Sequence, residues 1–132
     1  STWSRALLER QAWHRAARRR RANFRCLQSA FASDRRLALI GQPLCPVLPA
    51  GVSPLAFPIR VAGGRRDALR GALARRRVYA PVHWPLPRGV PAAEDAQRLA
   101  AAELSLPLDQ RYEPEDMAYL LRVLRQAWRD VS

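Results

Sequence analysis

The stretch Leu55-Ala-Phe-Pro-Ile-Arg-Val-Ala62 decides the fold class, because its apolar and β-branched residues predict a strand in the middle of the chain. Pro58 within it favours an edge strand or a bulge, since proline donates no hydrogen bond to a neighbouring strand. Two glycines turn the chain directly afterwards. Residues 67–77 then fit a helix with an acid in the first turn and arginines in the last, which matches the helix dipole at both ends.

Strands and helices continue to alternate toward the C-terminus. The stretch Val78-Tyr-Ala-Pro-Val-His-Trp84 predicts a second strand, again with an internal proline, and a Pro-rich loop follows it. A helix is predicted over residues 91–103 and a short third strand over residues 104–108. The last helix starts at Pro114 and carries an apolar stripe that we predict to be core.

The N-terminal part predicts one long helix, because residues 2–32 contain no proline or glycine and their apolar side chains recur at helical spacing. Residues 41–54 are Pro-rich and predict irregular structure. We therefore expect a single domain over residues 1–132, with a linking helix over 1–33 and a sheet with its covering helices over 54–132. The fold class is α/β, in the form of a two-layer α+β domain whose small three-stranded sheet is covered by helices.

The basic residues are all arginines. The chain has 23 Lys+Arg against 11 Asp+Glu, and none of the 23 is lysine. A Schiff base with a carbonyl cofactor, or a P-loop phosphate lysine, is therefore excluded within this chain. The formal net charge of +12 permits binding to phosphates, nucleic acid or an acidic membrane. The run from Arg18 to Arg21 covers nearly one helical turn, and we interpret it as a solvated helix face.

Cysteine usage and hydropathy bear on the compartment. Cys26 and Cys45 lack metal-ligand spacing, and we expect them to be buried free thiols. Residues 37–59 are uncharged, but five prolines interrupt them, so they predict no membrane helix. The chain begins at Ser1 and shows no signal-peptide pattern, so we expect a domain excised from a longer protein and a cytoplasmic location.

Few residues could carry chemistry, since the chain has two histidines and no known catalytic motif. His14 lies among arginines and is expected on the surface. His83 lies at a predicted strand end before a Pro-rich loop, where side chains commonly project into a cleft, although spacing alone favours a structural histidine. The connection Asp109-Gln-Arg-Tyr112 predicts either a turn with a capping role or an anion contact through Arg111.

Several segments together resemble one known family. They are Phe57-Pro-Ile-Arg-Val61, Arg66-Asp-Ala-Leu69, Val78-Tyr-Ala-Pro-Val-His-Trp-Pro85, Leu104-Ser-Leu-Pro-Leu-Asp-Gln-Arg-Tyr112 and Glu115-Asp-Met117. In this order and spacing they resemble the C-terminal small domain of the DegT/DnrJ/EryC1/StrS family of pyridoxal-phosphate-dependent sugar aminotransferases. The long helix ending Arg19-Arg-Arg-Ala-Asn-Phe24 also resembles the segment by which those enzymes enter their small domain. The resemblance covers essentially the whole chain.

The resemblance implies that this chain is part of a larger enzyme. These enzymes have the type I aminotransferase fold and move an amino group, usually from glutamate, onto a keto-sugar attached to a nucleotide, for polysaccharide or aminosugar biosynthesis. Their cofactor-binding lysine lies in a large N-terminal domain, so we expect no cofactor and no metal in this chain, and pyridoxal phosphate in the full-length enzyme. The expected partners are that large domain, a second subunit in a homodimer and the nucleotide-sugar substrate, but neither a membrane nor nucleic acid.

The same resemblance implies the site residues. By its position in the matched motif, His83 is expected to face the substrate. Tyr79, Trp84 and Arg111 are further expected substrate contacts. The loop over residues 85–91 is shorter than in many relatives, so it does not identify the sugar.

Two other functions stay open. A stand-alone nucleic-acid-binding module would use the basic helix over residues 15–25 to follow phosphates, and it predicts a strongly salt-dependent affinity for any duplex. A non-catalytic aminotransferase-like domain would instead serve dimerisation or regulation.

Overall fold

The long N-terminal helix is present in the part of the chain that the structure describes. The computed structural model describes residues 3, 13–83, 85–87, 89 and 91–132. Within them the first long helix is α2 (Trp13–Ser33), which confirms the helical prediction over that range. The remainder of the predicted helix, at residues 2 and 4–12, lies outside the described residues.

A three-stranded antiparallel sheet forms the centre of the molecule. In the described residues its strands are β1 (Gly41–Pro43), β2 (Ala56–Val61) and β3 (Glu103–Pro107), in the order β1-β2-β3. Both strand predictions on β2 and β3 are confirmed, as is the α+β fold class. The prediction of irregular structure over 41–54 is wrong for its first three residues, which form β1.

The predicted strand over residues 78–84 is wrong for residues 78–83, which form no strand. They run beside β3, but the backbone bond recorded between the two is a single one, from the amide of Ser105 to the carbonyl of Pro81 (3.0 Å). A proline has no N–H to return such a bond, so a ladder cannot form around Pro81.

β1 occupies the opposite edge of the sheet, where its backbone lies very close to that of β2. A Cβ on Gly41 would lie 2.3 Å from the carbonyl oxygen of Arg60.

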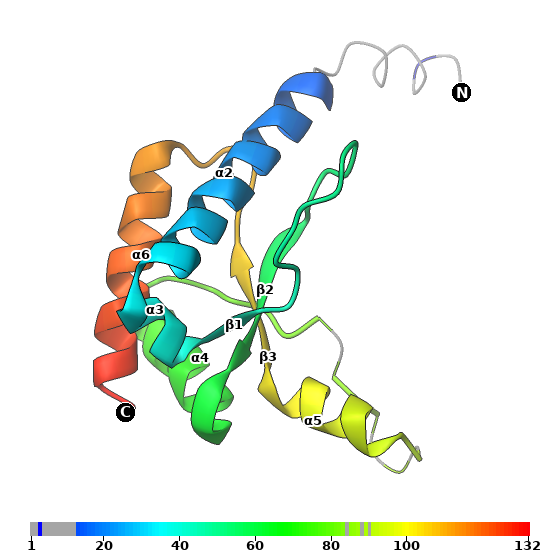
Figure 1. Cartoon of the computed structure of the whole chain (residues 1–132), viewed down its shortest axis with the longest axis vertical. Helices are drawn as coiled ribbons and strands as arrows, with labels where there is room; N and C mark the ends of the chain where they lie inside the picture. The colour runs from blue at the N-terminus through cyan, green and yellow to red at the C-terminus, as the bar shows by residue number, and fades with distance from the viewer. Residues whose placement is uncertain (1–2, 4–12, 84, 88, 90) are drawn as a thin grey trace.

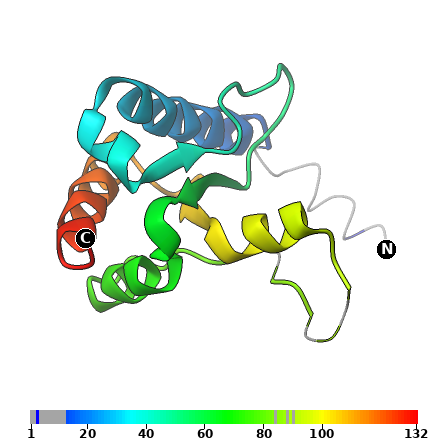
Figure 2. The same cartoon turned by 60° about the horizontal axis from the view of Figure 1, so that its bottom comes forward.

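The helices form two groups around the sheet. The remaining helical elements are α3 (Arg35–Ile40), η1 (Ala62–Gly64), α4 (Arg66–Arg75), α5 (Glu94–Ala102) and α6 (Pro114–Arg129). Figures 1 and 2 show α2, α3, α4 and α6 gathered on one side, while α5 lies away from them and contacts β2 and η1. The predicted helices over 67–77, 91–103 and from Pro114 are confirmed with small changes at their ends. The sequence did not predict α3, because six residues are too few to show a helical period.

One core joins the helices to the sheet. The ring of Phe57 on β2 packs edge-on against Phe24, with 4.9 Å between the ring centroids, and lies tilted against Phe31 at 5.5 Å; both partners come from α2. The predicted apolar stripe of α6 is buried in the same cluster, with Trp128 partly buried at its margin. The apolar pattern of the sequence therefore predicted the core side of these elements correctly.

The arginine run is not a solvated face along its whole length, which corrects our interpretation. Arg20 donates to Gln110 Oε1 (2.7 Å) and to the carbonyl of Pro54, and it pairs with Asp109. Arg21 donates to the carbonyls of Pro49 and Val52 in the connection between β1 and β2. These side chains hold two connections against α2, because a guanidinium offers five donors and can reach several carbonyl oxygens.

Cys26 and Cys45 are exposed free thiols, so the prediction that they are buried is wrong. Cys26 lies on the outer side of α2, between the buried positions Phe24 and Leu27, and Cys45 lies in the connection that follows β1. His14 is exposed, as predicted. Among the described residues, none of the helices combines the length and the apolar character that crossing a membrane requires.

Candidate functional site

His83 lies at the end of the extended segment beside β3 and is bonded to a buried polar pair. Its Nδ1 is 2.8 Å from the hydroxyl of Ser105, and that hydroxyl donates to Glu103 Oε1 at 2.6 Å. Ser105 is 1% exposed and Glu103 is 4% exposed, whereas His83 is half-buried. The three side chains form a chain of hydrogen bonds that runs from the interior to a partly accessible imidazole.

The alternation of side chains along β3 builds this arrangement. Leu104 and Leu106 point into the core, opposite Ile59 and Phe57 of β2. Glu103 and Ser105 therefore lie on the opposite face of the strand. The bond between Ser105 and Pro81 holds the neighbouring segment in place, so that His83 meets the Ser105 hydroxyl.

Ser105 and Glu103 were missed by sequence reasoning. The signal that could have found them is the pattern Glu-Leu-Ser-Leu over residues 103–106, in which polar residues alternate with leucines. Such a pattern ordinarily places the polar residues in water. Both are buried instead, and buried polar groups are retained only where hydrogen bonds compensate for their lost hydration.

The arrangement orients an imidazole and does not activate the serine. In a hydrolase triad the histidine stands between the serine and the acid. Here the serine stands in the middle, and its hydroxyl is almost completely buried. Ser105 is therefore not placed as a nucleophile, and the group that can meet another molecule is His83.

The other predicted site residues are not brought together with this group. Tyr79 is 73% exposed and lines a cavity of about 250 Å³ together with Pro107, near the far end of β3. Arg111 follows β3 at that same end and is exposed. Trp84 lies outside the described residues. The structure thus places His83 at one part of β3, and Tyr79 and Arg111 toward another.

Arg111 is paired within its own turn. Its Nε lies 2.6 Å from Asp109 Oδ1, and its amide also donates to that oxygen. The hydrogen bond from the Arg111 side chain lowers the pKa of the Asp109 carboxyl, and the same bond raises the pKa of Arg111. Both predicted roles of this connection are chemically available, because the turn is closed by Asp109 while the guanidinium stays exposed.

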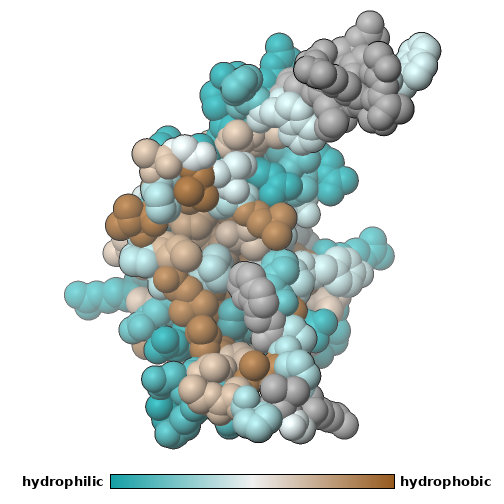
Figure 3. Space-filling view, turned by 90° about the vertical axis from the view of Figure 1, so that its right-hand side faces the viewer, coloured by the Kyte–Doolittle hydropathy of each residue, from teal (hydrophilic) through white to brown (hydrophobic). Residues whose placement is uncertain are grey.

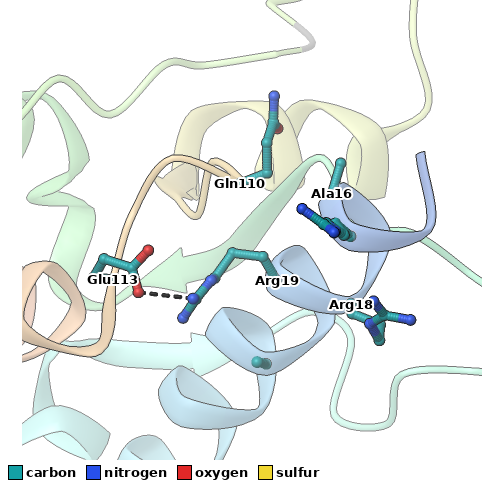
Figure 4. Close-up of a pocket in the computed structure, with 7 residues that line it drawn as sticks. Ala16, Arg18, Arg19, Gln110 and Glu113 are labelled. Atoms are coloured by element: carbon teal, nitrogen blue, oxygen red, sulfur yellow. Dashed lines mark ion pairs between the residues drawn. The ribbon is translucent and has the colours of Figure 1, made fainter. Parts of the chain in front are cut away.

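A separate cavity lies between α2 and the connection before α6. It has a volume of about 600 Å³ and is lined by Arg15, Ala16, Arg18, Arg19, Ala22, Gln110 and Glu113. Figure 4 shows Arg19 pointing toward Glu113, with which it forms an ion pair of 2.7 Å, while Arg18 points away. Of the predicted substrate-contact residues that the structure describes, His83, Tyr79 and Arg111 do not line this cavity. Among the described residues, no group of three or more His, Cys, Asp or Glu side chains could hold a metal ion.

The fold is similar to part of several solved aminotransferases. Helicobacter pylori PseC, an aminotransferase involved in the biosynthesis of pseudoaminic acid, matches 87% of this chain with 33% of its own, at 16% identity and a TM-score of 0.74. A DegT DnrJ EryC1 StrS aminotransferase from Brucella abortus matches 84% of this chain with 31% of its own, at 18% identity and a TM-score of 0.63. The pyridoxal-phosphate form of Spr1654, a sugar aminotransferase from Streptococcus pneumoniae, matches 89% of this chain with 32% of its own. The identity is 19% and the TM-score is 0.65.

The chain therefore has the fold of one part of an aminotransferase. More particularly, its likeness is to sugar aminotransferases of the DegT/DnrJ/EryC1/StrS type, which confirms the resemblance carried by the sequence motifs. It spans about a third of the length of these solved chains. No family profile and no curated protein sequence matches it.

Proposed function

We propose that this chain is the C-terminal small domain of a pyridoxal-phosphate-dependent sugar aminotransferase, which transfers an amino group from glutamate to a keto-sugar nucleotide. The observation that carries the proposal is a half-buried histidine, held by a buried serine and glutamate, on a fold shared with sugar aminotransferases. In this role His83 contacts the substrate. Tyr79, Trp84 and Arg111 are weaker candidates for the same task.

The cofactor belongs to another part of the enzyme. Pyridoxal phosphate needs a lysine amine to hold its aldehyde, and the 132 residues include no lysine. The residues of this chain therefore do not fit the cofactor, and the large domain would supply the lysine. This chain's own contribution is to bind and orient the substrate.

Exposed apolar side chains support a covering partner. Val47, Val52 and Leu55 are exposed in the connection between β1 and β2, and Leu86 and Leu99 are exposed around α5. Figure 3 shows apolar side chains gathered on one side of the molecule. Exposed apolar side chains that gather on one face are typical of an interface. We assign it to the large domain of the same polypeptide or to the second subunit of a cytoplasmic homodimer.

The first test is the reading frame upstream of Ser1 in the source DNA. The proposal expects it to encode a large α/β domain with a Schiff-base lysine. A start codon directly before Ser1 would contradict the proposal and favour a stand-alone domain.

The second test is kinetic and uses the full-length protein with glutamate and a keto-sugar nucleotide. His83→Ala should lower kcat/KM about tenfold or more, since one hydrogen bond to the substrate is lost. The absorbance of bound pyridoxal phosphate should not change. His14→Ala is the matched control, because His14 is exposed on α2. Unchanged kinetics for His83→Ala would remove His83 from the site.

A further inference from the structure

We propose that the cavity beside Tyr79 binds a small aromatic ring that carries a carboxylate or phosphate group. This site goes beyond the proposed function and does not rest on it. The cavity lies where the segment after α4 meets the start of α6, and its volume is about 250 Å³. That volume is below the range of sites for drug-sized ligands, so the cavity suits one ring with a short substituent.

All three tyrosines of the chain line this one cavity. They come from three separate places, since Tyr79 follows α4, Tyr112 precedes α6 and Tyr119 lies within α6. Tyr79 is 73% exposed and Tyr119 is 44% exposed, which leaves part of both rings available to another molecule. Aromatic rings attract one another beyond the effect of the buried area. The tyrosines therefore favour an aromatic occupant over an aliphatic one.

The inner side of the cavity is apolar. Val78, Met117 and Leu120 line it, and all three are almost completely buried in the core. A ring that enters the cavity would cover this apolar surface and be removed from water itself.

A cation is the less suitable charged partner for this site. The Asp116 carboxylate lines the cavity, but it already accepts a hydrogen bond from the amide of Glu113 (2.8 Å) in the capping box of α6. The guanidinium of Arg122 already lies over the ring of Tyr119, 5.2 Å from its centroid. The formal net charge of +12 also repels cations from the molecule and attracts anions.

Arg77 supplies the charge that an anion requires. It lines the cavity, its side chain is exposed, and in the described part of the chain that side chain forms no ion pair and no hydrogen bond. A guanidinium whose donors are unused matches the oxygens of a carboxylate or a phosphate. The combination of three tyrosines with this arginine therefore selects an aromatic anion.

Arg77 also occupies a backbone position that favours glycine. It follows the end of α4, where its amide donates to the carbonyl of Ala74, and its φ is 59°. Glycine is the usual residue at such a helix end, because the left-handed region strains residues with a Cβ. Among the described residues, Arg77 is the only one besides glycines with a positive φ. Strain of this kind gathers at ligand sites, which supports a binding role for the side chain.

Amide NMR of the isotope-labelled 132-residue chain tests the site with compounds that share a phenyl ring and differ in charge. Phenylacetate or phenyl phosphate should bind with a Kd of about 1 mM and shift the amides of residues 77–79 and 116–120. The tighter of the two identifies the anion. Uncharged phenylethanol should bind about fivefold more weakly, and cationic phenylethylamine more weakly still. Tighter binding of phenylethylamine, or no shift with either anion, would overturn the proposal.

Variants of Arg77 separate its charge from its backbone. Arg77→Ala removes the guanidinium and keeps a Cβ, so it should weaken binding of the preferred anion about fivefold and leave the melting temperature unchanged. Arg77→Gly should weaken binding equally but raise the melting temperature by about 3–6 °C. Arg75→Ala is the matched control, because Arg75 is exposed at the end of α4 and does not line the cavity. Binding by Arg77→Ala as tight as that of the wild type would refute the anion contact.

Tyr79→Ala tests the aromatic part of the site. It should weaken binding of phenylacetate about fivefold to tenfold, and circular dichroism should show a folded chain because Tyr79 is largely exposed. Leu39→Ala removes another exposed apolar side chain, from α3, and should bind like the wild type. Equal binding by Tyr79→Ala and the wild type would refute the ring contact. Because these measurements use this chain alone, their failure would leave the proposed aminotransferase function unchanged.

Discussion

Gly41 and Gly71 are two glycines whose missing side chains have opposite consequences. Gly41 opens β1 in extended backbone, and a Cβ there would lie 2.3 Å from the carbonyl oxygen of Arg60 on β2. The constraint is therefore contact with a neighbouring backbone and not an unusual dihedral angle. Gly71 lies within α4, where the nearest atom to an added Cβ is the flexible end of Arg75 at 3.7 Å.

We predict that Gly41→Ala destabilises the chain and that Gly71→Ala stabilises it. The first change forces two backbones apart, which should lower the free energy of unfolding by about 1–3 kcal/mol. The second restricts the unfolded chain without a clash and should raise it by about 0.5–1 kcal/mol. Urea unfolding of both variants measures the two values. Equal stability for Gly41→Ala and the wild type would show that β1 does not need this close approach.

At the level of elements, arginines of α2 attach the long connection between β1 and β2. Arg21 donates to two carbonyls of that connection, and Gln28 donates to a third, that of Pro46. These bonds join segments far apart in the sequence. The connection has no regular structure over most of its length, so its carbonyl groups have no partners in a strand ladder. Side chains of α2 donate hydrogen bonds to three of these carbonyls instead.

We predict that Arg21→Ala loosens this connection and leaves the core unchanged. Amide hydrogen exchange over residues 47–55 should quicken severalfold, because both Arg21 bonds are lost, while β3 and α6 should keep their protection. Arg25→Ala, at an exposed position of the same helix, is the control and should exchange like the wild type. Equal exchange in both variants would mean that other contacts hold the connection.

At the level of the whole molecule, ion pairs between elements make stability depend on acid. Asp34 caps α3 and pairs with Arg125 of α6 at 2.8 Å. The hydrogen bond from the amide of Arg36 is the main cause that lowers the pKa of the Asp34 carboxyl below its usual 3.8. Asp109, bonded to Arg111, has a lowered pKa as well.

A carboxyl whose pKa is lower in the folded state than in the unfolded state stabilises the fold. This stabilisation is complete at a pH above the unfolded-state pKa and is lost as the pH falls through the folded-state pKa. We therefore predict that the melting temperature falls as the pH drops below about 4. Asp34→Asn can still cap α3 but does not titrate, so its melting temperature should fall less steeply over that range. Parallel curves for this variant and the wild type would show that Asp34 does not contribute to the acid dependence.

In the folded molecule, several arginines of α2 bond to other elements of the chain. Arg19, Arg20 and Arg21 are engaged with Glu113, with the connection before α6 and with the connection after β1. A phosphate-binding helix would instead present such a run outward. These three arginines therefore join elements, whereas Arg15, Arg18 and Arg25 of the same helix are exposed.

The sequence by itself determined the elements whose side-chain period is local. The spacing of apolar residues in α2 and α6, and the composition of β2 and β3, depend only on neighbours along the chain. The motifs that resemble sugar aminotransferases are local patterns too, and the fold agrees with them. His83 was selected from its place before a Pro-rich loop and from its motif.

Only the tertiary structure decided which segment completes the sheet and what surrounds His83. Val78–His83 has strand composition, yet it forms no strand beside β3, where Pro81 lacks a donor. Gly41–Pro43 pairs with β2 at the opposite edge, where Gly41 allows close approach. Glu103 and Ser105 have a pattern that ordinarily faces water, but the neighbouring segment buries them and joins them to His83. His83 and Ser105 are 22 positions apart, and no local pattern records which polar groups will meet across that distance.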